Sequence, residues 1–280
     1  MKKIQRLCFL YILCCVLSIS LHAQKGWIQL FNGKDLTNWI IKIKDHPLNE
    51  NYGNTFRVEN GVMKVSYDQY NDQFKEQFGH IFYTQKFSAY LLVVEYRFTG
   101  DQIKDGPGWA YRNSGAMLHC QSPQSMALDQ DFPISLEMQL LGGNGKDERS
   151  TCNLCTPGTN VILNGKFFTP HCVNSTSKTF HGDQWVKVSA LVLGDSIIKH
   201  IVDKDTVITY TKPQYDGRDK WVKQEGFEDS ALISEGYISL QSESHPVEFR
   251  VVKLFDLSSY MNDRDKLNKI LLELQQRKEY

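Results

Sequence analysis

Glu137, Glu243 and His119 have side chains that can transfer protons near neutral pH, and each lies in a short segment of alternating apolar and polar residues. If the polar faces of these segments meet, one side chain can act as a general base and another as a general acid. We take Glu137 as the first candidate, with Glu243 as its counterpart and His119 as the alternative. For each residue, the competing interpretation is a solvated strand face, where Glu is an ordinary residue.

The alternation predicts which polar side chains share a face of a strand. The expected groups are Met117, His119 and Gln121 on one strand, Glu137 and Gln139 on a second, and Ser239, Gln241 and Glu243 on a third. Their neighbours on the opposite faces, such as Leu118, Leu136 and Leu240, are suited to a core. Three polar strand faces side by side would form one binding surface.

Other polar and aromatic residues are candidates for holding a substrate. Asn113, Ser114, Gln139 and Gln241 can hydrogen-bond it, although Asn-Ser-Gly is also a common turn sequence. Arg149 and His171 lie in a long segment that could fold over the surface, where His171 would supply an acid; as a lone loop histidine it can equally be a surface group. Trp109, Tyr111 and Trp185 could stack on a sugar ring or simply pack in the core.

A divalent cation is a further possibility, because imidazole and carboxylate groups are common ligands. His119, Glu137 and His171 would be its ligands, but their spacing matches no metal-binding motif.

The elements that must position these residues are short apolar runs with period two, broken by Gly, Asn, Asp and Pro. Twelve segments are predicted to be strands: 27–31, 56–59, 62–66, 80–84, 89–98, 115–120, 134–141, 186–193, 196–202, 206–210, 236–241 and 247–257. Asn60-Gly61 and Leu193-Gly194-Asp195 are predicted hairpin turns. With no helix expected between the strands, the pattern predicts an all-β antiparallel sandwich or jelly roll. Residues 142–184 resist assignment to strands and are expected to form a long ordered loop.

Both ends of the chain differ from this pattern. Lys2, Lys3 and Arg6 precede an apolar run, 7–21, which predicts a signal peptide at 1–23 cleaved after Ala23, with an uncleaved anchor or a lipoprotein as alternatives. No later segment is apolar enough to cross a membrane. One domain is expected over 24–260, followed by an amphipathic helix in 261–280. That helix would pack on the sandwich or bind a partner.

Charge and cysteine content limit the function further. The 32 basic and 32 acidic residues balance, so nucleic acid and anionic membranes are not expected partners. Removal of the signal peptide leaves Cys120, Cys152, Cys155 and Cys172. An even number in an exported chain indicates disulfides, in any of three pairings. The Cys152-x-x-Cys155 spacing also fits a zinc knuckle or a redox pair, and free buried thiols stay open.

Several segments in order resemble one family, the 3-keto-disaccharide hydrolase domain, also described as 3-keto-glucoside 1,2-lyase and 3-keto-2-hydroxy-glucal hydratase. They are GWIQLFNGKDLTNW at 26–39, FRVENGVM at 56–63, RNSG at 112–115, LEMQL at 136–140, GYISLQ at 236–241 and VEFR at 247–250. The resemblance implies a concanavalin A-like antiparallel sandwich whose curved outer sheet holds the ligand. Many members have Arg where His119 stands, so the role of this position does not transfer.

The resemblance also implies a periplasmic or secreted enzyme that acts on a glycoside already oxidised at C3 by a separate sugar 3-dehydrogenase. A base would remove the C2 proton, the C1 substituent would leave, and water would add to the product. Two other functions stay open. A non-catalytic, lectin-like module can use the same fold, and an ordinary two-carboxylate glycoside hydrolase could use Glu137 and Glu243, although the Glu-x-Asp-x-x-Glu strand common in sandwich glucanases is absent.

Overall fold

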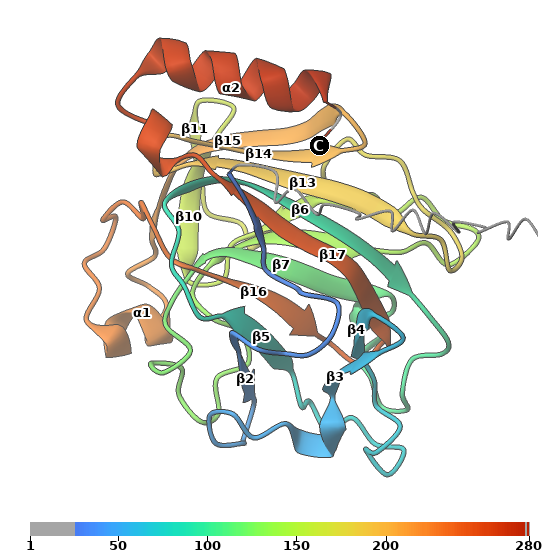
Figure 1. Cartoon of the computed structure of the whole chain (residues 1–280). Helices are drawn as coiled ribbons and strands as arrows, with labels where there is room; N and C mark the ends of the chain where they lie inside the picture. Colours follow the sequence, from blue (N-terminus) through green and yellow to red (C-terminus); the bar gives the residue numbers. More distant parts are fainter. Residues whose placement is uncertain (1–25, 278, 280) are drawn as a thin grey trace, which may run out of the picture.

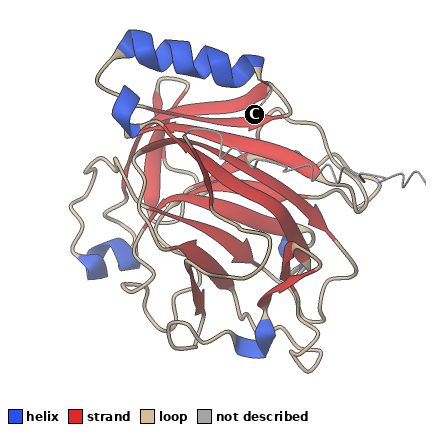
Figure 2. Cartoon of the chain, in the orientation of Figure 1, coloured by secondary structure: helices blue, strands red, loops and turns tan. Residues whose placement is uncertain are grey.

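Two antiparallel β-sheets packed face to face make up this protein, as a computed structural model shows for residues 26–277 and 279 (Figure 1, Figure 2). The predicted signal peptide lies outside the described residues. The large sheet contains β1 (Trp27–Gln29), β3 (Phe56–Glu59), β4 (Val62–Val65), β6 (Ala89–Phe98), β10 (Thr159–Leu163), β11 (Lys166–Phe168), β13 (Val186–Leu193), β14 (Ile197–Val202), β15 (Asp205–Tyr215) and β17 (Val247–Asp256). The small sheet contains β2 (Trp39–Ile43), β5 (Gly79–Tyr83), β7 (Asn113–Cys120), β8 (Leu136–Leu141), β9 (Asn153–Cys155), β12 (Cys172–Val173) and β16 (Tyr237–Ser242).

The order of the strands brings distant parts of the sequence together. The large sheet runs β11-β10-β15-β14-β13-β6-β17-β4-β3, with β1 on β17, and the small sheet runs β12-β9-β8-β7-β16-β5-β2. The three strands predicted to share a polar surface, β7, β8 and β16, are therefore neighbours in the middle of the small sheet. This arrangement places Glu137 of β8 and Gln241 of β16 on either side of β7.

The main core lies between the sheets, where alternate residues of each strand meet. On β8, for example, Leu136, Met138 and Leu140 are fully buried in this core, so Glu137 and Gln139 face outward. Each fully buried side chain of this size contributes about 1.5–3 kcal/mol relative to exposure. The predicted all-β antiparallel sandwich with a short C-terminal helix is confirmed.

Both predicted hairpin turns are present. Asn60 and Gly61 have positive φ values of 52° and 79° between the paired strands β3 and β4, as a tight two-residue turn requires. Gly194 has a φ of 57° where Leu193 of β13 pairs with Ile197 of β14.

Some elements were not predicted. The stretch 142–184 contains β9, β10, β11 and β12 instead of one long loop, because strands of two to five residues are too short to show a clear period. β2 was also missed. A helix, α1 (Lys220–Glu225), interrupts the expected run of strands and begins at Asp219, whose side chain accepts hydrogen bonds from the Trp221 and Val222 backbone N–H groups.

The C-terminal helix is α2 (Arg264–Gln276). Of the two roles considered for it, packing on the sandwich or binding a partner, the structure shows the packing. Leu274 is buried against Ala89, Leu91 and Leu191, on the outer face of the large sheet (Figure 1). No helix among the described residues is long and apolar enough to cross a membrane. With α2 on the large sheet, the outer face of the small sheet is available for a site.

Candidate active site

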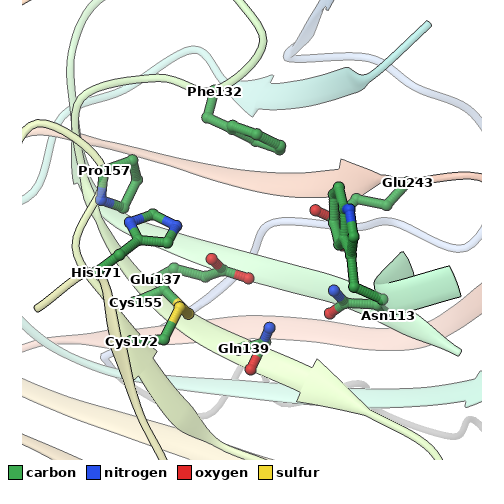
Figure 3. Close-up of a pocket in the computed structure, with 10 residues that line it drawn as sticks. Asn113, Phe132, Glu137, Gln139, Cys155, Pro157, His171, Cys172 and Glu243 are labelled. Carbon is green, nitrogen blue, oxygen red and sulfur yellow. A yellow bond between two sulfur atoms is a disulfide. The ribbon is translucent and has the colours of Figure 1, made fainter. Parts of the chain in front are cut away.

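A cavity of about 340 Å³ lies on the outer face of the small sheet (Figure 3). Strand residues Asn113, Glu137 and Gln139 form its floor together with Glu243, which follows β16. Its walls are Trp109, Phe132, Pro157, His171 and the Cys155–Cys172 disulfide. The cavity is thus a polar strand surface bordered by aromatic and apolar groups, the composition expected of a site for a small organic ligand.

Two carboxyl groups dominate the chemistry of the cavity. Glu137 is 6% exposed and Glu243 is 3% exposed, and Figure 3 shows the Glu137 carboxyl pointing into the space between His171 and Asn113. Burial raises the pKa of Glu137 to about 8. Burial, together with the charge of Glu137, raises the pKa of Glu243 well above its ordinary value. Two carboxyl groups that share a buried site keep a proton near neutral pH, so the pair can supply both an acid and a base.

The floor beside Glu137 depends on a glycine. A Cβ atom on Gly115 of β7 would lie 2.5 Å from Glu137 Oε1 and 3.0 Å from Gln241 Oε1. The two side chains therefore converge over a residue that has no side chain of its own. Glu137 Oε1 and both amide atoms of the Gln241 side chain are buried without a hydrogen-bond partner, and buried polar atoms of this kind are expected to have one.

His80 continues the row of buried polar side chains onto β5, although it does not line the cavity. It pairs with Gln241 across β5 and β16, is fully buried, and neither of its ring nitrogens has a partner. Burial, reinforced by the charge of Lys42, lowers the pKa of His80 to about 3, so the ring is neutral. Phe132 of the cavity wall packs edge-on against His80, with ring centroids 6.1 Å apart.

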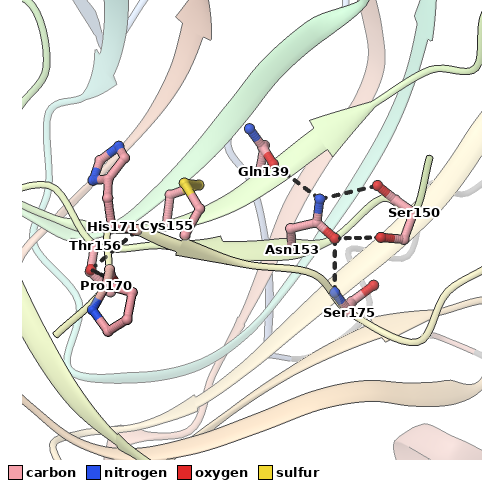
Figure 4. Close-up of a disulfide and its surroundings, with 9 residues drawn as sticks. Gln139, Ser150, Asn153, Cys155, Thr156, Pro170, His171 and Ser175 are labelled. Atoms are coloured by element: carbon pink, nitrogen blue, oxygen red, sulfur yellow. Dashed lines mark hydrogen bonds between the residues drawn. A yellow bond between two sulfur atoms is a disulfide. The ribbon is translucent and has the colours of Figure 1, made fainter. Parts of the chain in front are cut away.

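The disulfide joins β9 to β12 and builds one wall (Figure 4). The prediction of disulfides is confirmed for Cys155 and Cys172, whereas Cys120 and Cys152 are buried free thiols. His171, which precedes Cys172, is held because its backbone carbonyl accepts a hydrogen bond from the Thr156 backbone N–H at 2.8 Å. The long segment therefore does place His171 at the cavity, as expected.

Trp109 also lies where it was expected, at the cavity. It is 54% exposed and stacks on Phe78, with ring centroids 5.8 Å apart and planes 18° apart. An exposed ring braced from behind is suited to stacking on a sugar face.

Arg149 does not line the cavity but supports its rim. Its guanidinium donates to the carbonyl oxygens of Trp109, Tyr111, Arg112 and Gly142, and its charge lowers the pKa of Glu243 against the larger effect of burial. Arg149 was predicted to contact the substrate, but its guanidinium group instead holds the backbone of the segment that carries Trp109.

His119 was expected on the same face as Glu137, and that expectation is wrong. A β-bulge between β7 and β16 gives His119 a φ of 50° and shifts the alternation by one residue. The ring packs edge-on against core residue Tyr90, and its Nε2 lies 3.3 Å from the carbonyl oxygen of Gly194. Burial lowers the pKa of His119 to about 4. His119 is thus separated from the two carboxyl groups.

Ser114 and Trp185 are also placed away from the cavity. Ser114 lies on β7, not in a turn, and its hydroxyl donates to the Gln241 backbone carbonyl at 2.8 Å. Trp185 lies beside the large sheet, with the guanidinium groups of Arg97 and Arg250 4.6 Å and 4.5 Å from its ring. Tyr111 packs against His245, with ring centroids 5.0 Å apart.

The possible cation site is not assembled. Since His119 lies elsewhere, Glu137 and His171 lack the third ligand, and the described part of the chain has no group of three His, Cys, Asp or Glu residues that could hold a metal ion.

Sequence reasoning missed two residues of the cavity wall, Phe132 and Pro157, and also the buried His80 that pairs with Gln241. For His80 the sequence did contain a signal, because 80–84 was a predicted strand and His80 alternates with Ile81, a core residue. Asn153, which donates a hydrogen bond to Gln139, gave no such signal, since its strand has three residues.

Comparison with known proteins finds one family and several solved structures that resemble this chain. The family model of the 3-keto-alpha-glucoside-1,2-lyase-like domain matches residues 26–254. No curated protein matches the chain. Among solved structures, a candidate glycosyl hydrolase from Parabacteroides distasonis is 18% identical over 84% of this chain and 96% of its own, with a TM-score of 0.49. A Bacillus licheniformis β-glucanase is 14% identical over 83% of this chain and 99% of its own, with a TM-score of 0.45.

With TM-scores below 0.5, neither solved structure bears on the function of this chain. The family match, in contrast, covers most of the chain. It also confirms the resemblance carried by the segments from GWIQLFNGKDLTNW to VEFR. The protein therefore belongs to the 3-keto-alpha-glucoside-1,2-lyase-like domain family, a carbohydrate-related family.

Proposed function

We propose that this protein is an enzyme that cleaves 3-keto-glycosides by removing the C2 proton and expelling the C1 substituent. The observation that carries the proposal is the pair of buried carboxyl groups, Glu137 and Glu243, at one cavity, with both pKa values raised. Family membership favours the 3-keto-glycoside over other sugars.

In the first step, the ketone at C3 makes the C2 proton acidic and the Glu137 carboxylate accepts it. The electron pair left at C2 is delocalised onto the ketone oxygen as an enolate. A pKa of about 8 suits a base that works near neutral pH.

In the second step, the enolate collapses, a C1–C2 double bond forms and the bond from C1 to the leaving oxygen breaks. Glu243, which burial keeps protonated, donates its proton to that oxygen. Glu137 then holds the proton from C2 and Glu243 is ionised. Addition of water to the unsaturated product uses the two groups in the opposite roles and returns them to their initial states.

Substrate contacts follow from the cavity. Trp109 offers a face for the sugar ring, and Asn113 and Gln139 offer hydrogen bonds to its oxygens. Gln241, which was also predicted to contact the substrate, is fully buried beside Glu137 and does not line the cavity. His171 can contact the leaving group from the wall. No step in this scheme requires a metal ion.

The substrate and the compartment belong to the same proposal. The glycoside must first be oxidised at C3, so a separate sugar 3-dehydrogenase acts upstream. The Cys155–Cys172 disulfide is typical of oxidising compartments, which supports a periplasmic or secreted protein, as does the predicted signal peptide.

The decisive experiment incubates the purified protein with a 3-keto-glucoside and with its unoxidised parent. Cleavage of the keto form alone is the expected result, and Glu137→Gln should abolish it while leaving the fold intact. Cleavage of both sugars would instead indicate an ordinary two-carboxylate glycoside hydrolase, and binding without turnover would indicate a lectin-like module.

A further inference from the structure

Asn153 lies behind the cavity, and its amide group has every hydrogen-bonding position occupied. Its Oδ1 accepts from the Ser175 backbone N–H and from Ser150 Oγ, both at 2.8 Å. Its Nδ2 donates to Gln139 Oε1 at 3.1 Å and to the Ser150 carbonyl at 3.2 Å. Asn153 is 3% exposed, so these protein groups, and not solvent, decide how the amide is turned.

The Ser175 contact removes the usual ambiguity between the oxygen and nitrogen of an amide. A backbone N–H can only donate, so the atom of Asn153 that faces it must be the oxygen. The nitrogen of Asn153 must then face Gln139, and Gln139 must present its own oxygen to Asn153. The Gln139 nitrogen is left pointing away from Asn153, as Figure 4 shows, on a side chain that lines the cavity.

We propose that Asn153 is a positioning residue that locks Gln139 as a hydrogen-bond donor toward an oxygen of the substrate that can only accept. This inference rests on the proposed function. A ketone or enolate oxygen accepts but cannot donate, whereas the hydroxyl of an unoxidised sugar can do both. A locked donor therefore favours the keto-sugar, and a freely turning amide would suit either sugar equally.

The disulfide supports this relay. Cys155 pairs with Cys172, and Val173 pairs with Leu154, in the ladder between β9 and β12. Ser175 lies two residues beyond this ladder, opposite the start of β9. The covalent link therefore holds the backbone donor of Ser175 in reach of Asn153.

The test is a double-mutant cycle on kcat/KM for a 3-keto-glucoside. Asn153→Asp presents an acceptor to Gln139, which must then turn its nitrogen inward and its oxygen to the cavity. We expect kcat/KM to fall about 10²-fold, as for loss of one oxyanion donor. In a Gln139→Met background the same change should alter kcat/KM less than about twofold, because Asn153 acts only through Gln139. Asn160→Asp is the matched control, since Asn160 is equally buried, at 3% exposed, and lies on the large sheet.

Two further measurements complete the test, and the first of them keeps the outcome clear if Asn153→Asp disturbs folding. Gln139→Glu still offers Asn153 an acceptor, but it replaces the donor on the cavity side by a second acceptor, and it should lower kcat/KM about 10²-fold. Binding of the unoxidised parent sugar to Asn153→Asp should stay within about threefold of wild type, because its hydroxyl can donate to the turned amide.

Additive effects in the cycle, or full activity of Gln139→Glu, would overturn the inference while wild-type turnover left the proposed function intact. Absence of turnover by the wild-type protein would overturn both.

Discussion

The side chains of Glu137 and Gln241 meet over Gly115, where both would lie within 3.0 Å of a Cβ atom. They come from strands on either side of β7, so the glycine between them creates the room that the carboxyl group occupies. No positive φ is required at Gly115, so its lack of a side chain, and not its backbone freedom, is what the site uses.

Gly115→Ala should therefore impair catalysis while the protein stays folded. The added methyl group would lie 2.5 Å from Glu137 Oε1 and 2.9 Å from its Cγ, so the carboxyl group must move. Since a displacement of about 1 Å can cost about 10²-fold in rate, we expect kcat/KM for the keto-glucoside to fall by that order. Gly108→Ala, which adds a methyl group with nothing within 4 Å, is the control. Equal activity of the two variants would contradict the role of Gly115.

The pH dependence of the reaction should follow the two carboxyl groups. Glu137 must be ionised to act as a base, so kcat/KM should rise about tenfold per pH unit up to its pKa of about 8. Glu243 must be protonated, and its raised pKa predicts a fall at higher pH. Initial rates across the pH range would check this profile, and a rate independent of pH below 8 would exclude Glu137 as the base.

The same burial should make the ionised form of Glu137 unfavourable for the stability of the fold. Its pKa is about 8 in the folded protein and 4.5 in the unfolded chain, so its stabilising contribution is complete below pH 4.5 and is lost as the pH rises toward 8. The free energy of unfolding of the wild-type protein should therefore fall as the pH rises through this window. Glu137→Gln has no such loss. Its free energy of unfolding, relative to that of the wild-type protein, should therefore be greater at pH 8 than at pH 5. Urea unfolding at both pH values measures the difference, and an equal effect at both would rule out a raised pKa.

Trp109 should contribute to binding more than to turnover. Trp109→Ala is expected to raise KM about tenfold, which corresponds to about 1.4 kcal/mol, with little change in kcat. Phe167→Ala is a matched control, because Phe167 is an aromatic residue of nearly equal exposure, 55% against 54%, on β11 of the other sheet. A similar KM for the two variants would remove Trp109 from the substrate contacts.

Much of the fold and part of the site could be predicted from sequence because both depend on local alternation. Leu136, Met138 and Leu140 are apolar and were assigned to the core, which was enough to predict that Glu137 and Gln139 face outward. Gln241 and Glu243 were oriented by the same argument. What alternation could not give was the pairing that brings β16 next to β7.

His119 shows where alternation fails. The bulge that turns it inward depends on a close approach of two backbones, since a Cβ atom on Gly236 would lie 2.3 Å from the His119 carbonyl carbon. Gly236 is distant in sequence, so no window around residue 119 contains this information. The orientation of Asn153 is equally non-local, because the backbone of Ser175 determines it.

The Cys155–Cys172 disulfide bears on how the protein has to be produced. It ties down β12, a strand of two residues at the edge of the small sheet, so the cavity wall next to His171 is complete only after both thiols have been oxidised. A chain made in a reducing cytoplasm could keep both sheets, which are held by packing and hydrogen bonds, and still lack this wall. Recombinant material should therefore be checked for the Cys155–Cys172 bond itself before an inactive preparation is interpreted, because Cys120 and Cys152 are free thiols even in the oxidised protein.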